Sequence, residues 1–245
     1  MRFLLLVLLV LLSSCITQKR MERAASRVDL GQAYVKEGNE EAAIGTLREA
    51  TKIDPRNWRG HNLLAMAYIA KGENDLAEAS FQRALRINPG EAEILLNHGA
   101  WLVRTGKLDL AVADFQLALK DLDYRNPAMV QANLAYTLLL AGRHDEALGW
   151  VREAIRRAPT LCEAYYDLGL IQEARKDSLA ALEAYDQLIK TCPQEAAGGM
   201  LRTGCVQVEV GMTEEGVASL KRVIEGTPGT AFADEARACL KTLGP

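Results

Sequence analysis

The sequence predicts an all-α fold, a right-handed superhelix of about six helix-turn-helix repeats followed by a C-terminal capping helix. Six of the seven prolines are 34, 38, 32, 34 and 35 residues apart, at Pro55, Pro89, Pro127, Pro159, Pro193 and Pro228. A column of alanines has nearly the same period and consists of Ala43, Ala77, Ala111, Ala147 and Ala181. A fixed period of this length indicates one helical hairpin repeated along the chain. A proline is expected to close each repeat, because it cannot continue the second helix.

The first repeat shows the full set of periodic positions, which are Leu30, Gly31, Tyr34, Gly38, Ala43, Leu47, Ala50 and Pro55. Small residues are expected where two antiparallel helices approach most closely, and a glycine is expected at the end of the first helix. This pattern resembles that of the tetratricopeptide repeat family. The resemblance implies hairpins that stack on their neighbours and bury a shared core between them.

The predicted solenoid covers residues 24–245, with no separate catalytic domain. Its repeats are expected at about 24–57, 58–91, 92–127, 128–161, 162–196 and 197–230, with the capping helix at 231–243. The sixth repeat has the weakest pattern, because Thr203 and Gln207 stand where apolar residues are expected.

Residues 1–14 are typical of a secretory signal, because one basic residue precedes an apolar run that is too short to span a bilayer. The quartet Leu12-Ser13-Ser14-Cys15 resembles the lipobox of bacterial lipoproteins, which implies cleavage before Cys15 and acylation of that residue. An ordinary signal peptide with an incidental cysteine is the alternative. Residues 15–23 would then form a lipid-anchored linker, whose three basic residues are either solvated or in contact with acidic headgroups.

Charge and motifs argue against several function classes. The chain has 29 Lys and Arg residues against 32 Asp and Glu residues, which excludes the basic footprint of a nucleic-acid-binding protein. It contains no nucleotide-binding glycine loop, nucleophile elbow or H-E-x-x-H motif. His61, His98 and His144 belong to different repeats and are expected at the surface or in a groove. We therefore expect no enzyme activity, no metal and no cofactor apart from the lipid on Cys15.

Four further cysteines lie near the C-terminus, and an even number in an exported protein suggests disulfides. Cys162 begins the first helix of the fifth hairpin and Cys192 ends the second, so a bridge between them is geometrically reasonable. Cys205 and Cys239 are one repeat apart. Equivalent positions on stacked helices lie about 9 Å apart, which makes this second bridge the less favoured pair. Four free buried thiols are the alternative.

The concave face is the surface expected to serve function. One face of the first helix of each repeat carries a stripe, which we call the predicted stripe: Val28, Gln32, Val35, Asn62, Met66, Ile69, Leu96, Ala100, Val103, Ala132, Tyr136 and Leu139. Most of these residues are apolar, which indicates a groove for an amphipathic segment of a partner. The alternative is that the curvature of the superhelix buries part of the stripe.

A lipobox followed by about six such repeats resembles the pilotins of type IV pilus secretins, the PilF, PilW and Tgl group. The resemblance implies a monomeric protein that is lipid-anchored at the outer membrane, with its solenoid in the periplasm. Its partner would be a PilQ-like secretin subunit, whose outer-membrane localisation and multimerisation it promotes for pilus biogenesis and motility. The alternative function is an adaptor lipoprotein that scaffolds peptidoglycan enzymes or β-barrel assembly.

Overall fold

The structure is a computed structural model that describes the backbone of residues 2–243 and the side chains of residues 18–243. Within these residues the regular secondary structure is helical. The helices are α1 (Arg2–Lys36), α2 (Glu40–Ile53), α3 (Trp58–Lys71), α4 (Asn74–Ile87), α5 (Ala92–Arg104), α6 (Leu108–Ala118), α7 (Pro127–Leu140), α8 (His144–Arg157), α9 (Cys162–Ala174), α10 (Ser178–Thr191), the 3-10 helix η1 (Pro193–Glu195), α11 (Ala196–Glu209), α12 (Thr213–Gly226) and α13 (Ala231–Lys241).

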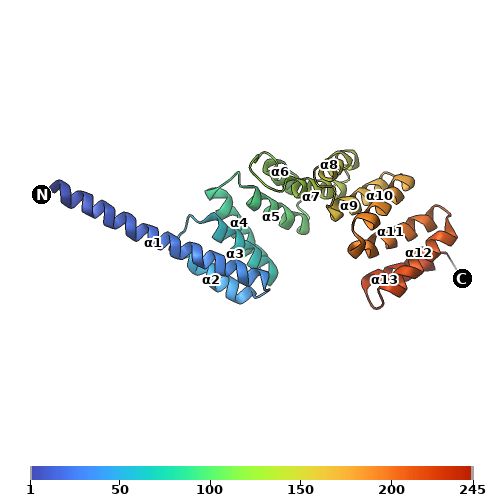
Figure 1. Cartoon of the computed structure of the whole chain (residues 1–245), viewed down its shortest axis with the longest axis horizontal. Coiled ribbons are helices and arrows are strands. Elements are labelled where there is room, and N and C mark those ends of the chain that lie inside the picture. The colour runs from blue at the N-terminus through green and yellow to red at the C-terminus, as the bar shows by residue number, and fades with distance from the viewer. Residues whose placement is uncertain (1, 244–245) are drawn as a thin grey trace. The chain divides into compact units, whose positions relative to one another are not determined.

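The chain divides into two compact units, Met1–Thr105 and Gly106–Pro245, which we call the N-terminal unit and the C-terminal unit. The sequence predicted one continuous solenoid, but the division falls between α5 and α6, inside the predicted third repeat. Because each repeat of a solenoid depends mainly on its nearest neighbours, such a chain can divide at any one interface. Consecutive helices pack in pairs within each unit, such as α1 on α2 and α7 on α8 (Figure 1).

Polar caps and turn residues set the helix ends. Asn57 accepts a hydrogen bond from the backbone N–H of Gly60 at 2.9 Å at the start of α3, and Gly72 ends that helix with a φ of 82°. In the fifth hairpin the equivalent position is Lys176, which has a φ of 65°. A side chain in this left-handed region is strained, because its Cβ crowds the following carbonyl oxygen.

Five of the six periodic prolines lie directly after the C-cap of the second helix of a hairpin, and they are Pro55, Pro89, Pro159, Pro193 and Pro228. The prediction that Pro127 closes the third repeat is wrong, because Pro127 is the first residue of α7. A proline is tolerated there, since the N–H that it lacks has no partner within the helix at that position.

The core of the N-terminal unit forms where the first helix of a hairpin meets the second. Leu47 of α2 is fully buried in a cluster with Val28, Leu63 and Ala77. A Cβ placed on Gly31 of α1 would lie 2.5 Å from the Leu47 side chain, so the two helices approach too closely for any larger residue. This close approach explains the glycine in the repeat pattern.

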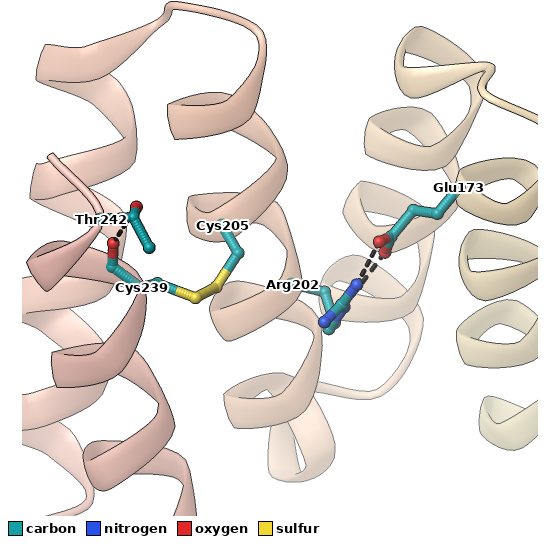
Figure 2. Close-up of a disulfide and its surroundings, with 5 residues drawn as sticks. All are labelled: Glu173, Arg202, Cys205, Cys239 and Thr242. Atoms are coloured by element: carbon teal, nitrogen blue, oxygen red, sulfur yellow. Dashed lines mark hydrogen bonds and ion pairs between the residues drawn. A yellow bond between two sulfur atoms is a disulfide. The ribbon is translucent and has the colours of Figure 1, made fainter.

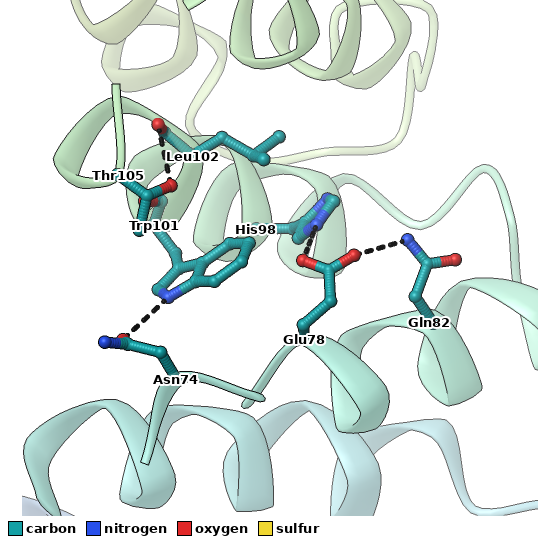
Figure 3. A network of polar contacts seen from close by, with 7 residues as sticks. All are labelled: Asn74, Glu78, Gln82, His98, Trp101, Leu102 and Thr105. Carbon is teal, nitrogen blue, oxygen red and sulfur yellow. Dashed lines mark hydrogen bonds and ion pairs between the residues drawn. The ribbon is translucent and has the colours of Figure 1, made fainter. Parts of the chain in front are cut away.

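A buried polar and aromatic cluster lies beside this core (Figure 3). His98 is only 5% exposed, stacks on Trp101 with ring centroids 5.7 Å apart, and places Nε2 3.6 Å from the Glu78 carboxylate. Trp101 donates its indole N–H to Asn74 at 3.4 Å. The expectation that the histidines lie at the surface or in a groove is wrong for His98, because its ring fills the space between α4 and α5.

The C-terminal unit contains both disulfides. Cys162 is bonded to Cys192, with a Cα–Cα distance of 6.0 Å between the start of α9 and the end of α10. Cys205 of α11 is bonded to Cys239 of α13, with a Cα–Cα distance of 5.7 Å (Figure 2). The expected separation of about 9 Å for this second pair is wrong. Helix α13 packs on both α11 and α12 through the fully buried Ala233 and Ala236, whose small side chains allow a closer approach.

Candidate protein-binding grooves

In the N-terminal unit, much of the predicted stripe is part of the core. Val28 is only 2% exposed and belongs to the central apolar cluster, while Val35, Met66 and Ile69 pack against it. The remaining members Gln32, Leu96 and Val103 are half-buried, and Ala100 is exposed. An open apolar stripe is therefore not what this unit presents, because neighbouring hairpins cover most of it.

Asn62 belongs to the predicted stripe and is fully buried. Its side-chain amide donates to the carboxylate of Glu93 at 3.2 Å, and its oxygen accepts a hydrogen bond from Asn97 at 3.4 Å. A buried amide needs such partners, because an unsatisfied one costs free energy. Asn62 thus joins α3 to α5 rather than facing a ligand.

In the C-terminal unit the stripe borders open space. Ala132 is buried, Tyr136 is 38% exposed and Leu139 is half-buried. Ala132 and Tyr136 line a cavity of about 680 Å³, and Tyr136 and Leu139 line a second cavity of about 530 Å³. The structure therefore brings this part of the stripe to two neighbouring cavities, with Tyr136 in the wall of both.

We call the first cavity the acidic groove and define it by Tyr136, Glu163, Tyr166, Asp167, Glu195 and Phe232. Helix α7 contributes Tyr136, helix α9 the next three residues, η1 the carboxylate of Glu195, and α13 the ring of Phe232. Phe232 is 42% exposed. The described residues that line this cavity include three carboxylates and no lysine or arginine. The groove thus combines aromatic side chains with carboxylates.

Asp167 is the most unusual group of the acidic groove. The residue is only 9% exposed, and its carboxyl group has no hydrogen bond or ion pair with any residue that the structure describes. Burial, together with the nearby negative charge of Glu163, raises the pKa of Asp167 to about 7. Burial also raises the pKa of Tyr166, whose ring packs at 5.9 Å from that of Tyr185.

We call the second cavity the Arg202 groove and define it by Leu139, Leu140, Leu170, Glu173, Lys176 and Arg202. Here the buried charges are paired, because the carboxylate of Glu173 accepts hydrogen bonds from the guanidinium of Arg202 (Figure 2). The same carboxylate also accepts a hydrogen bond from the hydroxyl of Tyr185. Burial and the hydrogen bond to Glu173 raise the pKa of Tyr185.

Basic residues gather on part of the N-terminal unit. Lys19, Arg20, Arg23 and Lys52 line a shallow cavity of about 450 Å³, and Arg20 donates to the carbonyl of Ile53 at 2.9 Å. These residues of α1 continue directly into the first hairpin, so residues 18–23 of the predicted linker are helical. A helix rises about 1.5 Å per residue, which gives this segment a shorter reach than an extended chain.

Cys15 lies outside the residues whose side chains the structure describes. In the part of the chain with described side chains, no helix is both long and apolar enough to cross a membrane. The same part contains no cluster of three His, Cys, Asp or Glu side chains that could hold a metal ion.

The predicted stripe ended one repeat too early. Adding the period of 34 residues to Ala132, Tyr136 and Leu139 gives Tyr166, Leu170 and Glu173, and all three line a cavity. The periodicity could therefore have found them. Asp167 and Phe232 had no such signal, because neither falls in the stripe.

The tetratricopeptide repeat family matches residues 28–92 and 96–161, and a second model of the same family matches residues 163–194. No curated protein matches the chain in sequence.

Three solved structures show the same fold. PilW, described as a widely conserved type IV pilus biogenesis factor, superposes with a TM-score of 0.82 at 21% identity, over 89% of this chain and 98% of PilW. PilF of Pseudomonas aeruginosa superposes with a TM-score of 0.77 at 22% identity, over 90% of this chain and 99% of PilF. YrrB, a protein with an unusual peptide-binding site, superposes with a TM-score of 0.58 at 20% identity, over 74% of this chain and 93% of YrrB. The matched repeats cover more than half of the sequence, and the chain belongs to the tetratricopeptide repeat family.

Proposed function

We propose that this protein is a pilotin, which binds a type IV pilus secretin subunit and promotes its localisation to the outer membrane and its multimerisation. The observation that carries the proposal is the extent of the structural match. Almost the full lengths of PilW and PilF superpose on this chain, and PilW is a type IV pilus biogenesis factor. The match thus extends over most of this chain as well as over nearly all of PilW and PilF, so it is not confined to a single repeat.

The acidic groove is the site that we assign to the secretin. Tyr136 and Phe232 are large apolar residues that remain substantially exposed in it. Aromatic residues of this kind contribute strongly to protein interfaces, since they bury a large area at a small cost in side-chain entropy. An amphipathic segment that is exposed in the secretin monomer and buried in the multimer would fit this surface. The role is binding rather than catalysis, and we assign it to a monomer without nucleic acid or cofactor.

The proposed location is the periplasmic face of the outer membrane, through a lipid on Cys15. The lipobox-like quartet before that residue supports this assignment. Two disulfides in the C-terminal unit are also consistent with it, because structural disulfides persist in oxidising compartments such as the periplasm.

The proposal is tested by deleting the gene and complementing with the wild-type protein. Loss of heat-resistant secretin multimers and of surface pili, with both restored by the wild-type gene, is the expected result. Normal multimers in the deletion strain would contradict the pilotin function. Normal multimers together with altered peptidoglycan or β-barrel assembly would favour the adaptor function instead.

The anchor is tested separately with Cys15→Ala. The wild-type protein is expected in the outer-membrane fraction, whereas the variant should lose this location because it lacks the acylated residue. Cys162→Ala together with Cys192→Ala is the matched control, since it removes two cysteines without touching the anchor. The variant Cys15→Ala found in the outer membrane at the wild-type level would refute lipid anchoring.

A further inference from the structure

The negative charge of the acidic groove is not balanced by basic residues in the wall that the structure describes. Glu163, Asp167 and Glu195 line it, and no basic residue among the described residues of its wall offsets them. A partner segment that enters this cavity must bring its own positive charge, or it will bury the carboxylates without compensation.

A comparison of two acidic residues of α9 shows that one is paired within the protein and the other is not. Glu173 and Asp167 both lie on α9, and both are largely removed from solvent. Glu173 is paired with Arg202 and with the hydroxyl of Tyr185. Asp167 has no such partner among the residues that the structure describes. Buried carboxyl groups are normally hydrogen-bonded, so an unpaired one that lines a cavity indicates a ligand group.

The aromatic residues define the rest of the ligand. Tyr136, Tyr166 and Phe232 line the same cavity as Asp167. Aromatic faces attract cations, and the methylene stems of lysine and arginine pack on apolar surfaces while their charged ends reach a polar group. A lysine or arginine that is flanked by apolar side chains matches this combination.

We propose that the acidic groove binds an amphipathic segment of the secretin through a lysine or arginine that pairs with Asp167. Glu163 and Glu195 supply further negative charge around the bound cation, and the aromatic residues hold the apolar neighbours of the basic residue. This inference rests on the proposed function, because it specifies the chemistry of the partner at the same groove.

The first experiment uses the detergent-solubilised full chain and a random peptide library displayed on phage. Selected peptides are expected to carry a lysine or arginine next to apolar residues. Their affinity for Asp167→Asn is expected to fall about thirtyfold or more, since one partner of a buried charge pair is lost. Asp186→Asn, which changes an exposed carboxylate outside the groove, should bind them as the wild type does.

The second experiment removes the cation from the peptide instead of the anion from the protein. Replacing the basic residue of a selected peptide by norleucine should weaken binding to the wild type as much as Asp167→Asn does. The same replacement should have little effect on binding to Asp167→Asn, because the pair is already broken. Selection of peptides without basic residues, equal binding to Asp167→Asn, or independent effects of the two changes would each overturn the inference.

The third experiment separates this inference from the proposed function. Overlapping peptides that cover the secretin subunit of the same organism are tested on the wild type and on Asp167→Asn. Binding of a basic amphipathic segment that depends on Asp167 supports both proposals. If the phage peptides bind through Asp167 but no secretin peptide binds, the pilotin assignment fails and the recognition chemistry stands.

Discussion

The two units differ in what borders the predicted stripe. In the N-terminal unit Val28 is buried and Asn62 is bonded to Glu93, so the first-helix stripe holds neighbouring hairpins together. In the C-terminal unit the residue equivalent to Val28 and Asn62 is Ala132, which is also buried, but the next two residues of the stripe, Tyr136 and Leu139, line a cavity. The first position of the stripe is thus structural in both units, whereas the second and third positions of the C-terminal unit border space that a partner can enter. Periodicity identifies equivalent positions, but it does not show whether a neighbour covers them.

The largest effect is expected from Val28→Asp, which places a charge in the core of the N-terminal unit. The free energy of unfolding of this unit should fall by about 4 kcal/mol, because the substitution adds a buried carboxylate without a partner. Chemical denaturation monitored by circular dichroism measures the loss. Ala100→Asp, at an exposed position of the same stripe, should lower stability by less than about 1 kcal/mol, mainly through the poorer helix propensity of aspartate. Equal losses for the two variants would contradict the division of the stripe into buried and exposed positions.

Asp167→Asn is expected to stabilise the C-terminal unit in a pH-dependent way. The pKa of Asp167 is about 7 in the folded protein, above its ordinary value of 3.8. As the pH rises from about 4 to about 7, the unfolded chain ionises more readily than the folded one, and the wild type loses stability. The variant lacks this loss, so it should be more stable by on the order of 3 kcal/mol above pH 7.

Denaturation of both proteins at pH 4 and pH 8 measures this difference. The gain should be near zero at pH 4, where the wild-type carboxyl is largely neutral in the folded state and only partly ionised in the unfolded one. Glu183→Gln is the control, because that carboxylate is exposed and does not line the acidic groove, so its removal should have a small effect. A gain for Asp167→Asn that is the same at both pH values would show that burial of its charge is not the cause.

Tyr136→Asp tests whether the exposed part of the stripe binds the partner. The side chain is 38% exposed, so folding should be little affected, while affinity for the partner segment should fall at least about tenfold. Leu179→Asp adds the same charge at a residue that is 77% exposed and should leave binding unchanged. Isothermal titration with a bound peptide gives both affinities. Unchanged binding by Tyr136→Asp would place the partner site elsewhere.

The smallest effect is expected from Lys176→Gly, in the turn of the fifth hairpin. Relief of the left-handed strain at φ 65° should outweigh the greater freedom of glycine in the unfolded chain, for a gain of about 0.5 to 1 kcal/mol. Lys176→Ala removes the same charge but keeps the strain. A gain from alanine as large as that from glycine would attribute the effect to charge rather than to the backbone.

Sequence reasoning was sufficient for features that depend on local chemistry. The hairpin period placed the helix pairs, and the bridge between Cys162 and Cys192 followed from the geometry of one hairpin. Sequence patterns did not predict contacts between elements that are distant along the chain. Cys205 and Cys239 lie closer than stacked equivalents should, because Ala233 and Ala236 let α13 approach its neighbours.

The candidate site also depends on contacts that the sequence pattern does not predict. Extending the period by one repeat gives Tyr166 and Leu170, but the period gives no reason to select Asp167. Its importance lies in having no partner while Glu173 has two, and pairing is a property of three-dimensional neighbours. Phe232 reaches the groove from α13, which is separated from α9 along the chain by three further α-helices.

The all-helical repeat, the residues at which hairpins turn and the five prolines that follow them can be read from the sequence, because these features depend on backbone preferences within a few residues. Tertiary structure alone decided that the chain divides after Thr105, that Pro127 begins a helix and that Val28 is covered while Tyr136 is not. Burial and charge pairing depend on which surfaces meet in three dimensions, and the repeat period does not specify those neighbours.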